Sequence, residues 1–222
     1  MCAPNGNTLE LNNGLRGRRR CIARCCWPIA ARGALRVVRA KTARPMKLRS
    51  HVFVKSEGGR WFLLQHELVT RGAAYVRPRR DNHARGEELI ALEAQARKAE
   101  RGMWERRVYR PLSVRAATEQ AVASNQSCLR GAAPYRVLEG RVGAARVFQN
   151  RAALTMEGST EEAPFTLLVF GENFSAWDGP ALSSLTGARV RARGPMGVYR
   201  DAPQLCLEHG SQLEVLTKNQ PT

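Results

Sequence analysis

The chain has 222 residues, and 36 lysines and arginines against 19 aspartates and glutamates give it a formal net charge of +17. This excess favours a polyanionic partner, because basic side chains displace the counterions condensed on phosphates. The six cysteines lack zinc-ligand spacing, which argues against a metal–thiolate site. The adjacent Cys25 and Cys26 cannot easily bridge each other and the other cysteines lie far apart, so we expect free thiols. Residues 1–15 contain no basic run followed by an apolar core, so we expect no signal peptide. We also expect no membrane span.

Residues 1–47 show no sustained hydrophobic period of either 2 or 3.6 residues. From Leu11 to Ser56 the chain contains no aspartate or glutamate, while arginines and lysines are frequent. Much of the positive charge therefore belongs to this segment.

The zone 48–109 alternates strand and helix signals. Residues 51–55 favour a strand and are followed by turn residues, which predicts a hairpin. Residues 62–72 carry apolar side chains at helical spacing and end at Gly72, a residue typical of a helix C-terminus. Between Glu87 and Trp104 apolar residues recur three and four apart, which predicts the most regular helix of the chain.

The last half of the chain divides into a connection and a β-rich zone. Residues 110–133 contain Arg, Ala and Ser with one weak helical stretch around residues 116–122, and we interpret them as a linker. Residues 134–217 are expected to fold independently of the rest. Strand signals occur at residues 138–147, 152–156, 165–170, 189–193, 204–207 and 213–216. A short helix signal follows the third of these, and the first five strands with this helix match the order of the five-stranded oligonucleotide-binding (OB) barrel.

Several segments in the zone 48–109 occur together in an order found in one known family. They are residues 67–72, 74–76 and 93–98, with Trp104 closing the helix. This arrangement resembles the C-terminal half of a thermonuclease (staphylococcal-nuclease-like) domain. The resemblance implies an α+β, mainly β protein: an incomplete nuclease-type OB barrel with C-terminal helices, followed by a second five-stranded OB-like barrel at residues 134–217. Residues 1–47 would then be a degenerate N-terminal part of the nuclease barrel.

The resemblance also implies calcium-dependent hydrolysis of phosphodiester bonds. In the family, carboxylates hold calcium, paired arginines stabilise charge on the phosphorus, and a glutamate is the traditional general base. Here Asn7 stands at the position of a calcium ligand, and an amide brings no charge. Lys47 or Arg49 aligns with the second phosphate-contacting arginine, while the acid-free segment offers neither the second ligand nor the base. We therefore expect impaired catalysis and no cofactor in this chain.

The acid-free segment has two explanations that the sequence leaves open. Residues 16–47 are rich in Arg, Ala and Cys and lack periodicity, as the product of a local reading-frame shift would be. A basic arm that binds nucleic acid is the functional alternative.

The zone 134–217 combines basic and aromatic residues, which suits phosphate neutralisation together with base stacking. We interpret Phe148 and Phe165 as core residues, because alternation in a barrel also requires inward aromatic side chains. The candidate nucleic-acid-binding residues are Arg141, Arg146, Arg151, Arg191 and Arg193.

Three functions follow from this sequence. The first is a thermonuclease-family homologue with impaired catalysis, and the alternative is a non-catalytic protein that binds single-stranded DNA or RNA through the OB-like zone. A module for protein contacts is the third possibility, which salt-insensitive and weak binding to nucleic acid would favour.

Overall fold

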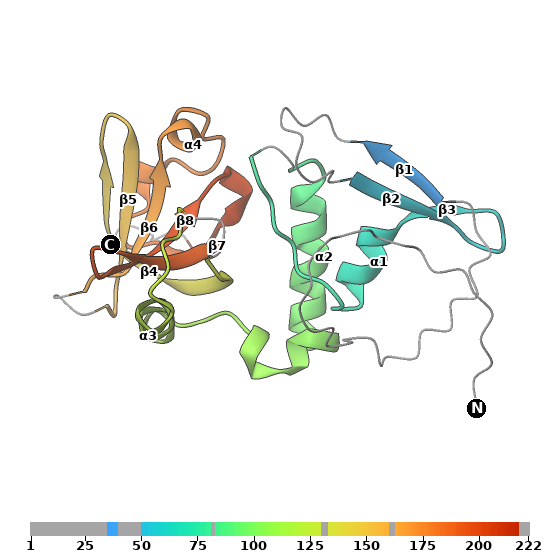
Figure 1. Cartoon of the computed structure of the whole chain (residues 1–222), viewed down its shortest axis with the longest axis horizontal. Coiled ribbons are helices and arrows are strands. Elements are labelled where there is room, and N and C mark those ends of the chain that lie inside the picture. The colour runs from blue at the N-terminus through green and yellow to red at the C-terminus, as the bar shows by residue number, and fades with distance from the viewer. Residues whose placement is uncertain (1–34, 40–49, 81–82, 130–132, 160–162, 218–222) are drawn as a thin grey trace, which may run out of the picture. The chain divides into compact units, whose positions relative to one another are not determined.

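The computed structural model describes residues 35–39, 50–80, 83–129, 133–159 and 163–217. These residues form a small three-stranded sheet with two helices, followed by a larger six-stranded sheet with helices beside it (Figure 1). The prediction of an α+β, mainly β protein is confirmed. A second barrel is not seen in these ranges, in which the first sheet has three strands.

The first sheet is antiparallel and has the order β1-β2-β3. Its elements and the helices that follow are β1 (Leu35–Arg39), β2 (Ser50–Lys55), β3 (Trp61–Leu63), α1 (Leu64–Thr70) and α2 (Gly86–Lys98). The predicted hairpin is confirmed, since β2 pairs with β3 and Gly59 has a φ of +79° in the turn between them. α1 begins directly after β3, and Gly72 follows it with a φ of +66°.

The helix α2 carries the apolar stripe that the sequence predicts. Leu89, Ile90 and Ala96 are buried, and so is the carboxylate of Glu93, which is 0% exposed. A 3-10 turn, η1 (Gly102–Glu105), then buries Trp104. Gly102 packs closely on the turn that follows α1, and a Cβ added there would lie 2.6 Å from the carbonyl oxygen of Gly72.

The segment predicted to be a linker contains a helix that belongs to the larger sheet. α3 (Val114–Ser124) is capped at its N-terminus by Ser113, whose hydroxyl accepts a hydrogen bond from the Ala116 amide at 3.3 Å. Its apolar side contributes Val114, Ala117 and Ala121 to the core of that sheet. The small residues at this contact hide the helical period in the sequence, because alanine gives a weak apolar signal.

A disulfide joins the end of this segment to the larger sheet. Cys128 and Cys206 are bonded, with Cα atoms 5.7 Å apart, although they are separated by 78 residues in the sequence. The expectation of free thiols is therefore wrong for this pair. We call residues 112–217, held together by α3 and this bond, the β domain.

The larger sheet confirms the six predicted strand positions. Its elements are β4 (Tyr135–Val147), β5 (Arg151–Met156), β6 (Thr166–Phe170), α4 (Glu172–Ser175), η3 (Leu182–Ser184), β7 (Arg189–Tyr199), β8 (Ala202–Leu207), η4 (Gly210–Gln212) and β9 (Leu213–Thr217). β4 is shared by two neighbours, since its first half pairs with β7 and its second half with β5, with an irregularity between Val142 and Ala144. β6 and β8 are parallel, and the other pairs are antiparallel.

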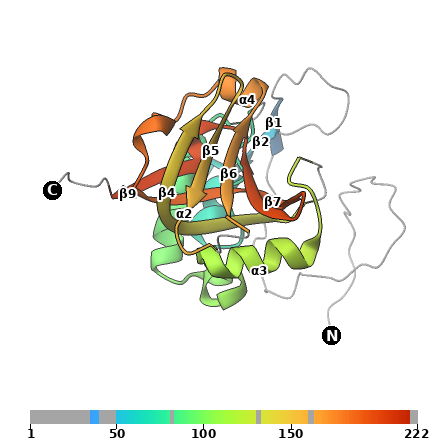
Figure 2. The ribbon, with the colours of Figure 1, turned by 90° about the vertical axis from the view of Figure 1, so that its left-hand side faces the viewer.

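The core of the β domain lies on the inner side of these strands. Leu154, Leu167 and Val169 are fully buried, and they alternate with residues that face outward. Phe165 is also fully buried, as predicted. Figure 2 shows β4, β5 and β6 side by side, with α3 along one end of the sheet. The outer side of these three strands is the part of the domain that the candidate site uses.

Candidate nucleic-acid interface

The hairpin that joins β4 to β5 carries exposed aromatic and basic side chains. The Phe148 amide donates to the Arg151 carbonyl at 2.8 Å, which closes the turn. Phe148 is 42% exposed, so its interpretation as a core residue is wrong. The guanidinium carbon of Arg151 lies 4.6 Å from the centre of the Phe148 ring, within the range of a cation–π contact.

A second exposed ring lies beside Arg151 on the next strand. In the register of β5 and β6, Arg151 is directly opposite Phe170, which is 43% exposed. Directly opposite residues of an antiparallel pair share one face of the sheet. Arg151 is therefore flanked by two aromatic residues, one in the turn and one at the end of β6.

Arg146 joins this group from β4. It is opposite Ala153, which shares the outward face of β5 with Arg151 because successive side chains alternate between the two faces. The inward neighbours Ala152 and Leu154 are fully buried. Arg146, Arg151 and Phe170 thus lie on the outward face of three adjacent strands, and with Phe148 they form what we call the hairpin patch.

The two arginines of the hairpin patch keep their charge available. Within the ranges that the structure describes, neither Arg146 nor Arg151 is ion-paired with a carboxylate. An exposed guanidinium without a carboxylate partner can bind phosphate through two parallel hydrogen bonds. Arrangement and charge therefore suit a ligand that combines flat rings with phosphates.

Arg141 lies in a different setting, before the irregularity in β4. Its Nη1 donates to the Gly187 carbonyl at 2.6 Å, and its Nε lies 3.7 Å from the Glu157 carboxylate. In the register of β4 and β7 it is opposite Arg189. The structure therefore does not bring Arg141 into the hairpin patch.

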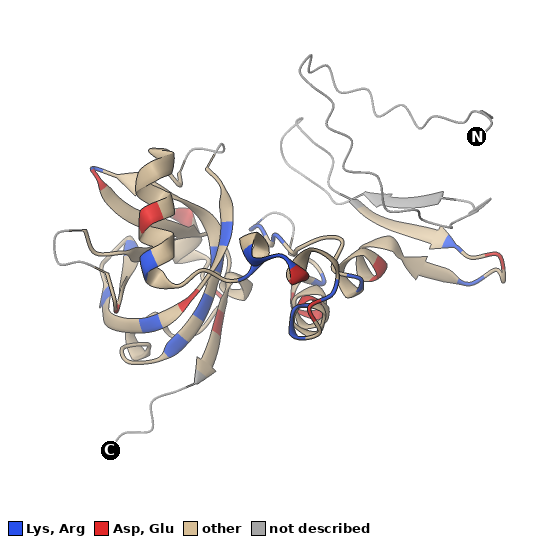
Figure 3. Cartoon of the chain, turned by 90° about the horizontal axis from the view of Figure 1, so that it is seen from below, with Lys and Arg blue, Asp and Glu red and all other residues tan. Residues whose placement is uncertain are grey.

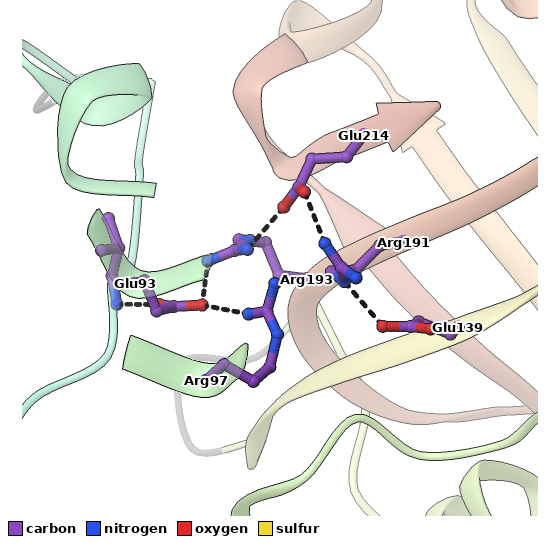
Figure 4. Close-up of polar contacts among 7 residues, drawn as sticks. Glu93, Arg97, Glu139, Arg191, Arg193 and Glu214 are labelled. Atoms are coloured by element: carbon purple, nitrogen blue, oxygen red, sulfur yellow. Dashed lines mark hydrogen bonds and ion pairs between the residues drawn. The ribbon is translucent and has the colours of Figure 1, made fainter. Parts of the chain in front are cut away.

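Arg193 and Arg191, two of the predicted nucleic-acid-binding residues, are paired with carboxylates in the structure. Arg193 is 0% exposed and donates to Glu93 at 2.9 Å and to Glu214 at 2.6 Å (Figure 4). Arg191 donates to Glu139 at 2.7 Å and to the other oxygen of Glu214 at 2.8 Å. In this arrangement neither guanidinium faces a ligand, because both are already bonded within the protein.

The carboxylate of Glu93 connects α2 to this network. It accepts hydrogen bonds from the Val76 amide at 2.7 Å, from Arg97 at 2.9 Å and from Arg193. Burial alone would lower the pKa of Arg193, but Glu93 and Glu214 outweigh this effect and raise it above its ordinary value. Arg193 therefore stays charged, and the network fixes α2 to β7 and β9. We call it the buried ion network, and its charged side chains are Glu93, Arg97, Glu139, Arg191, Arg193 and Glu214.

The remaining sequence candidates lie outside the described residues. These are Asn7, Lys47 and Arg49, together with the acid-free segment except for its residues 35–39 and 50–56. In the part of the chain that is described, no group of three or more histidines, cysteines, aspartates or glutamates could hold a metal ion. The helices of that part include none with the length and apolar character needed to cross a membrane.

Phe170 is the residue of the hairpin patch that the sequence did not single out. It ends a strand whose inward positions are apolar, and its place beside Arg151 depends on the register of β5 and β6. Alternation along β5 and β6 could have predicted that Arg151 and Phe170 both face outward. It could not have predicted that they lie opposite each other, because that depends on the register of the two strands.

Comparisons with known proteins give little support for any family. No family model matches the chain, and no curated protein does. Membership of the thermonuclease family is therefore not shown. Among solved structures, the p204 HINb domain is 10% identical with a TM-score of 0.32, and the match covers 48% of this chain and 47% of that one. The aspartyl tRNA synthetase from Entamoeba histolytica is 10% identical with a TM-score of 0.28, and the match covers 44% of this chain and 24% of the synthetase. This chain spans less than half the length of either structure, and likenesses this distant carry no argument about function.

Proposed function

We propose that the β domain is an OB-type module that binds single-stranded nucleic acid through the hairpin patch. The strand pairings support the fold assignment, because they run β4-β5-β6-β8-β7 and return to β4. In OB folds, the second and third strands and the loop before them form part of the usual ligand face. Here these are β5, β6 and the turn that carries Phe148.

The observation that carries the proposal is the position of Arg151 between two exposed rings. Phe148 and Phe170 offer flat surfaces on which bases can stack, and Arg151 and Arg146 offer guanidinium groups to the phosphates between them. Stacking of a base on an aromatic side chain contributes about 1–3 kcal/mol and tolerates any base. Single strands suit this patch better than duplexes, since only unpaired bases expose their faces.

Catalysis is not part of the proposal. The nuclease reaction that the sequence resemblance implies would depend on Asn7, Lys47 or Arg49, which lie outside the described residues, and on acidic partners that the sequence lacks from Leu11 to Ser56. The hairpin patch contains cations and aromatic rings but no general base. It is therefore suited to binding rather than to hydrolysis.

The proposal is tested by fluorescence anisotropy of a labelled oligothymidylate with the full chain at two salt concentrations. Phe148→Ala combined with Arg151→Gln should weaken binding about tenfold or more, because one stacking surface and one phosphate contact are lost. The matched control is Val122→Ala with Arg115→Gln, which changes an exposed apolar residue and an exposed arginine on α3. The control should bind as the unchanged protein does.

Two results would overturn the proposal. Equal affinity for the F148A/R151Q variant and its control would exclude the hairpin patch as the site. An unchanged protein that is folded but shows no salt-dependent binding would exclude nucleic acid as the ligand and favour a module for protein contacts.

A further inference from the structure

A second basic surface lies outside the β domain, in the connection between α2 and α3 (Figure 3). Residues 105–110 are all exposed and include a 3-10 turn, η2 (Arg107–Tyr109). Arg110 is paired with Glu100 at 2.7 Å. Arg106 and Arg107 have no ion pair with any residue that the structure describes. We call residues 105–110 the basic turn.

The basic turn is fixed at its first end by η1. Trp104 is 2% exposed and lies beneath the guanidinium group of Arg97, with 5.6 Å between the guanidinium carbon and the ring centre. The Met103 amide donates to the Gly72 carbonyl at 2.9 Å. The chain therefore enters the turn from a buried anchor.

The other end of the basic turn is fixed to the β domain. The Leu112 amide donates to the Val137 carbonyl at 2.8 Å, and the Leu112 carbonyl accepts from the Glu139 amide at 2.9 Å. Inside the turn, the Tyr109 amide donates to the Arg106 carbonyl at 3.1 Å. A segment held at both ends and hydrogen-bonded within loses less conformational freedom when it binds a ligand.

The side chains that the basic turn presents suit one class of ligand. Arg106 and Arg107 are adjacent guanidinium groups without a carboxylate partner in the described chain, and Tyr109 adds a ring that is 42% exposed. Two exposed arginines on helices are paired with a carboxylate one helical turn away, Arg71 with Glu67 and Arg115 with Glu119. Adjacent free cations beside an aromatic ring match a phosphate backbone with unstacked bases.

We infer that the basic turn is a second contact site for the phosphate backbone of single-stranded nucleic acid. The inference rests on the proposed function and extends it, because it makes the binding surface longer than the hairpin patch. Each phosphate neutralised on a single strand contributes about 0.7 to the slope of log affinity against log salt concentration. Longer strands should therefore bind more tightly and with a steeper salt dependence than strands that occupy one patch.

The test compares two labelled oligothymidylates, of about 6 and about 30 nucleotides, since one OB domain covers about 4–16 nucleotides. In the full chain, Arg106→Gln with Arg107→Gln should lower affinity for the long strand about tenfold and flatten its salt slope by up to about 1.4. Affinity for the short strand should stay within about twofold, because the hairpin patch alone can hold it. The matched control, R71Q/R115Q, removes the same formal charge from ion-paired arginines and should leave both affinities within about twofold.

Each alternative result is informative, provided that circular dichroism shows all variants to be folded. An unchanged affinity for the long strand in R106Q/R107Q overturns the inference. An equal loss in the control, or an equal loss on both strands, also overturns it, because net charge would then explain the effect. Failure of the proposed function looks different: F148A/R151Q would weaken neither strand, while R106Q/R107Q would still weaken the long one.

Discussion

The arginines of the hairpin patch and those of the buried ion network come from the same sequence pattern and have opposite surroundings. Arg146 and Arg151 are exposed and have no carboxylate partner among the described residues. Arg191 and Arg193 are bonded to Glu139, Glu93 and Glu214. Basic residues among apolar strands can therefore serve either recognition or stability, and the carboxylates within reach decide between the two.

Position in the sheet explains why the surroundings differ. Arg151 is the first residue of β5 and lies at the tip of a hairpin, where it is exposed between Phe148 and Phe170. Arg193 is in the middle of β7, which pairs with β4, β8 and β9. A side chain in a central strand meets neighbours on every side, so a charge there requires partners.

The largest expected effect concerns the division of the chain into parts. A fragment of residues 134–217 should show no cooperative unfolding transition in urea. It lacks Val114, Ala117 and Ala121 of α3, which are buried in the core, and it leaves Arg193 without Glu93. These losses together approach the whole stability of a small domain, which is about 5–15 kcal/mol. A cooperative transition in this fragment would show that the strands suffice, as the sequence alone suggests.

The next effect isolates the buried ion network. Glu93→Gln should destabilise the full chain by about 3–5 kcal/mol, because it removes one of the two carboxylates that compensate a fully buried guanidinium. Adding Arg193→Met to Glu93→Gln should cost less than E93Q alone, because the introduced amide oxygen can still accept from the Val76 amide and no buried guanidinium lacks its partner. Urea unfolding measures both, with Glu119→Gln on the exposed face of α3 as the control. A loss for E93Q no larger than that of the control would contradict a stabilising role for the network.

A smaller effect separates the two groups of arginines by their response to salt. Arg146→Gln with Arg151→Gln should flatten the salt slope of oligothymidylate binding by up to about 1.4, because two phosphate contacts are lost. Arg191→Gln should leave the slope unchanged in the folded protein, because its guanidinium is bonded to Glu139 and Glu214. Fluorescence anisotropy at several salt concentrations gives both slopes. A flatter slope for R191Q would return this residue to the binding surface.

The smallest effect concerns acid and a histidine that belongs to neither group of arginines. His209 stacks on His83 with ring centres 4.0 Å apart, and its Nδ1 accepts the Ser211 amide at 3.2 Å. Burial lowers the pKa of His209 below its ordinary 6.5, and His83 adds to this effect while Asp178 opposes it. The unfolded chain then binds a proton that the folded protein does not, so the free energy of unfolding should fall as pH decreases below 6.5.

This pH dependence is measured by urea unfolding at about pH 7.5 and about pH 5.5, on either side of the ordinary histidine pKa. His209→Asn is the matched variant, because asparagine can cap the η4 turn but does not titrate in this range. It should show a weaker loss of stability in acid than the unchanged protein. The same loss in both would mean that another group causes the acid sensitivity.

The sequence could predict elements better than partners. The strands of the β domain and the helix α2 follow from alternation and from an apolar stripe, both of which are local. The disulfide between Cys128 and Cys206 and the docking of α3 depend on segments that meet only in the folded chain. Glu93 illustrates the difference most clearly, since a glutamate in a charged helix is expected in solvent and here is fully buried.

The candidate site follows the same division. Arg146 and Arg151 could be selected from charge and composition, whereas their separation from Arg191 and Arg193 required the register of β4 with both of its neighbours. The assignments of Asn7, Lys47 and Arg49 lie outside the described residues and stay predictions.

The shared strand β4 also orders events in time. Its second half pairs with β5, which follows after a short turn, so that Val142 lies opposite Met156. Its first half pairs with β7, which is much later in the sequence, and Leu138 lies opposite Ala192. Local hairpins form within microseconds, while distant pairings are slowed by the entropy of closing a long loop. During synthesis the hairpin that carries Phe148 and Arg151 therefore emerges and pairs before β7 exists. Until β7 is synthesised, the first half of β4 lacks the strand with which it pairs, and an unpaired strand edge of this kind can bind other chains.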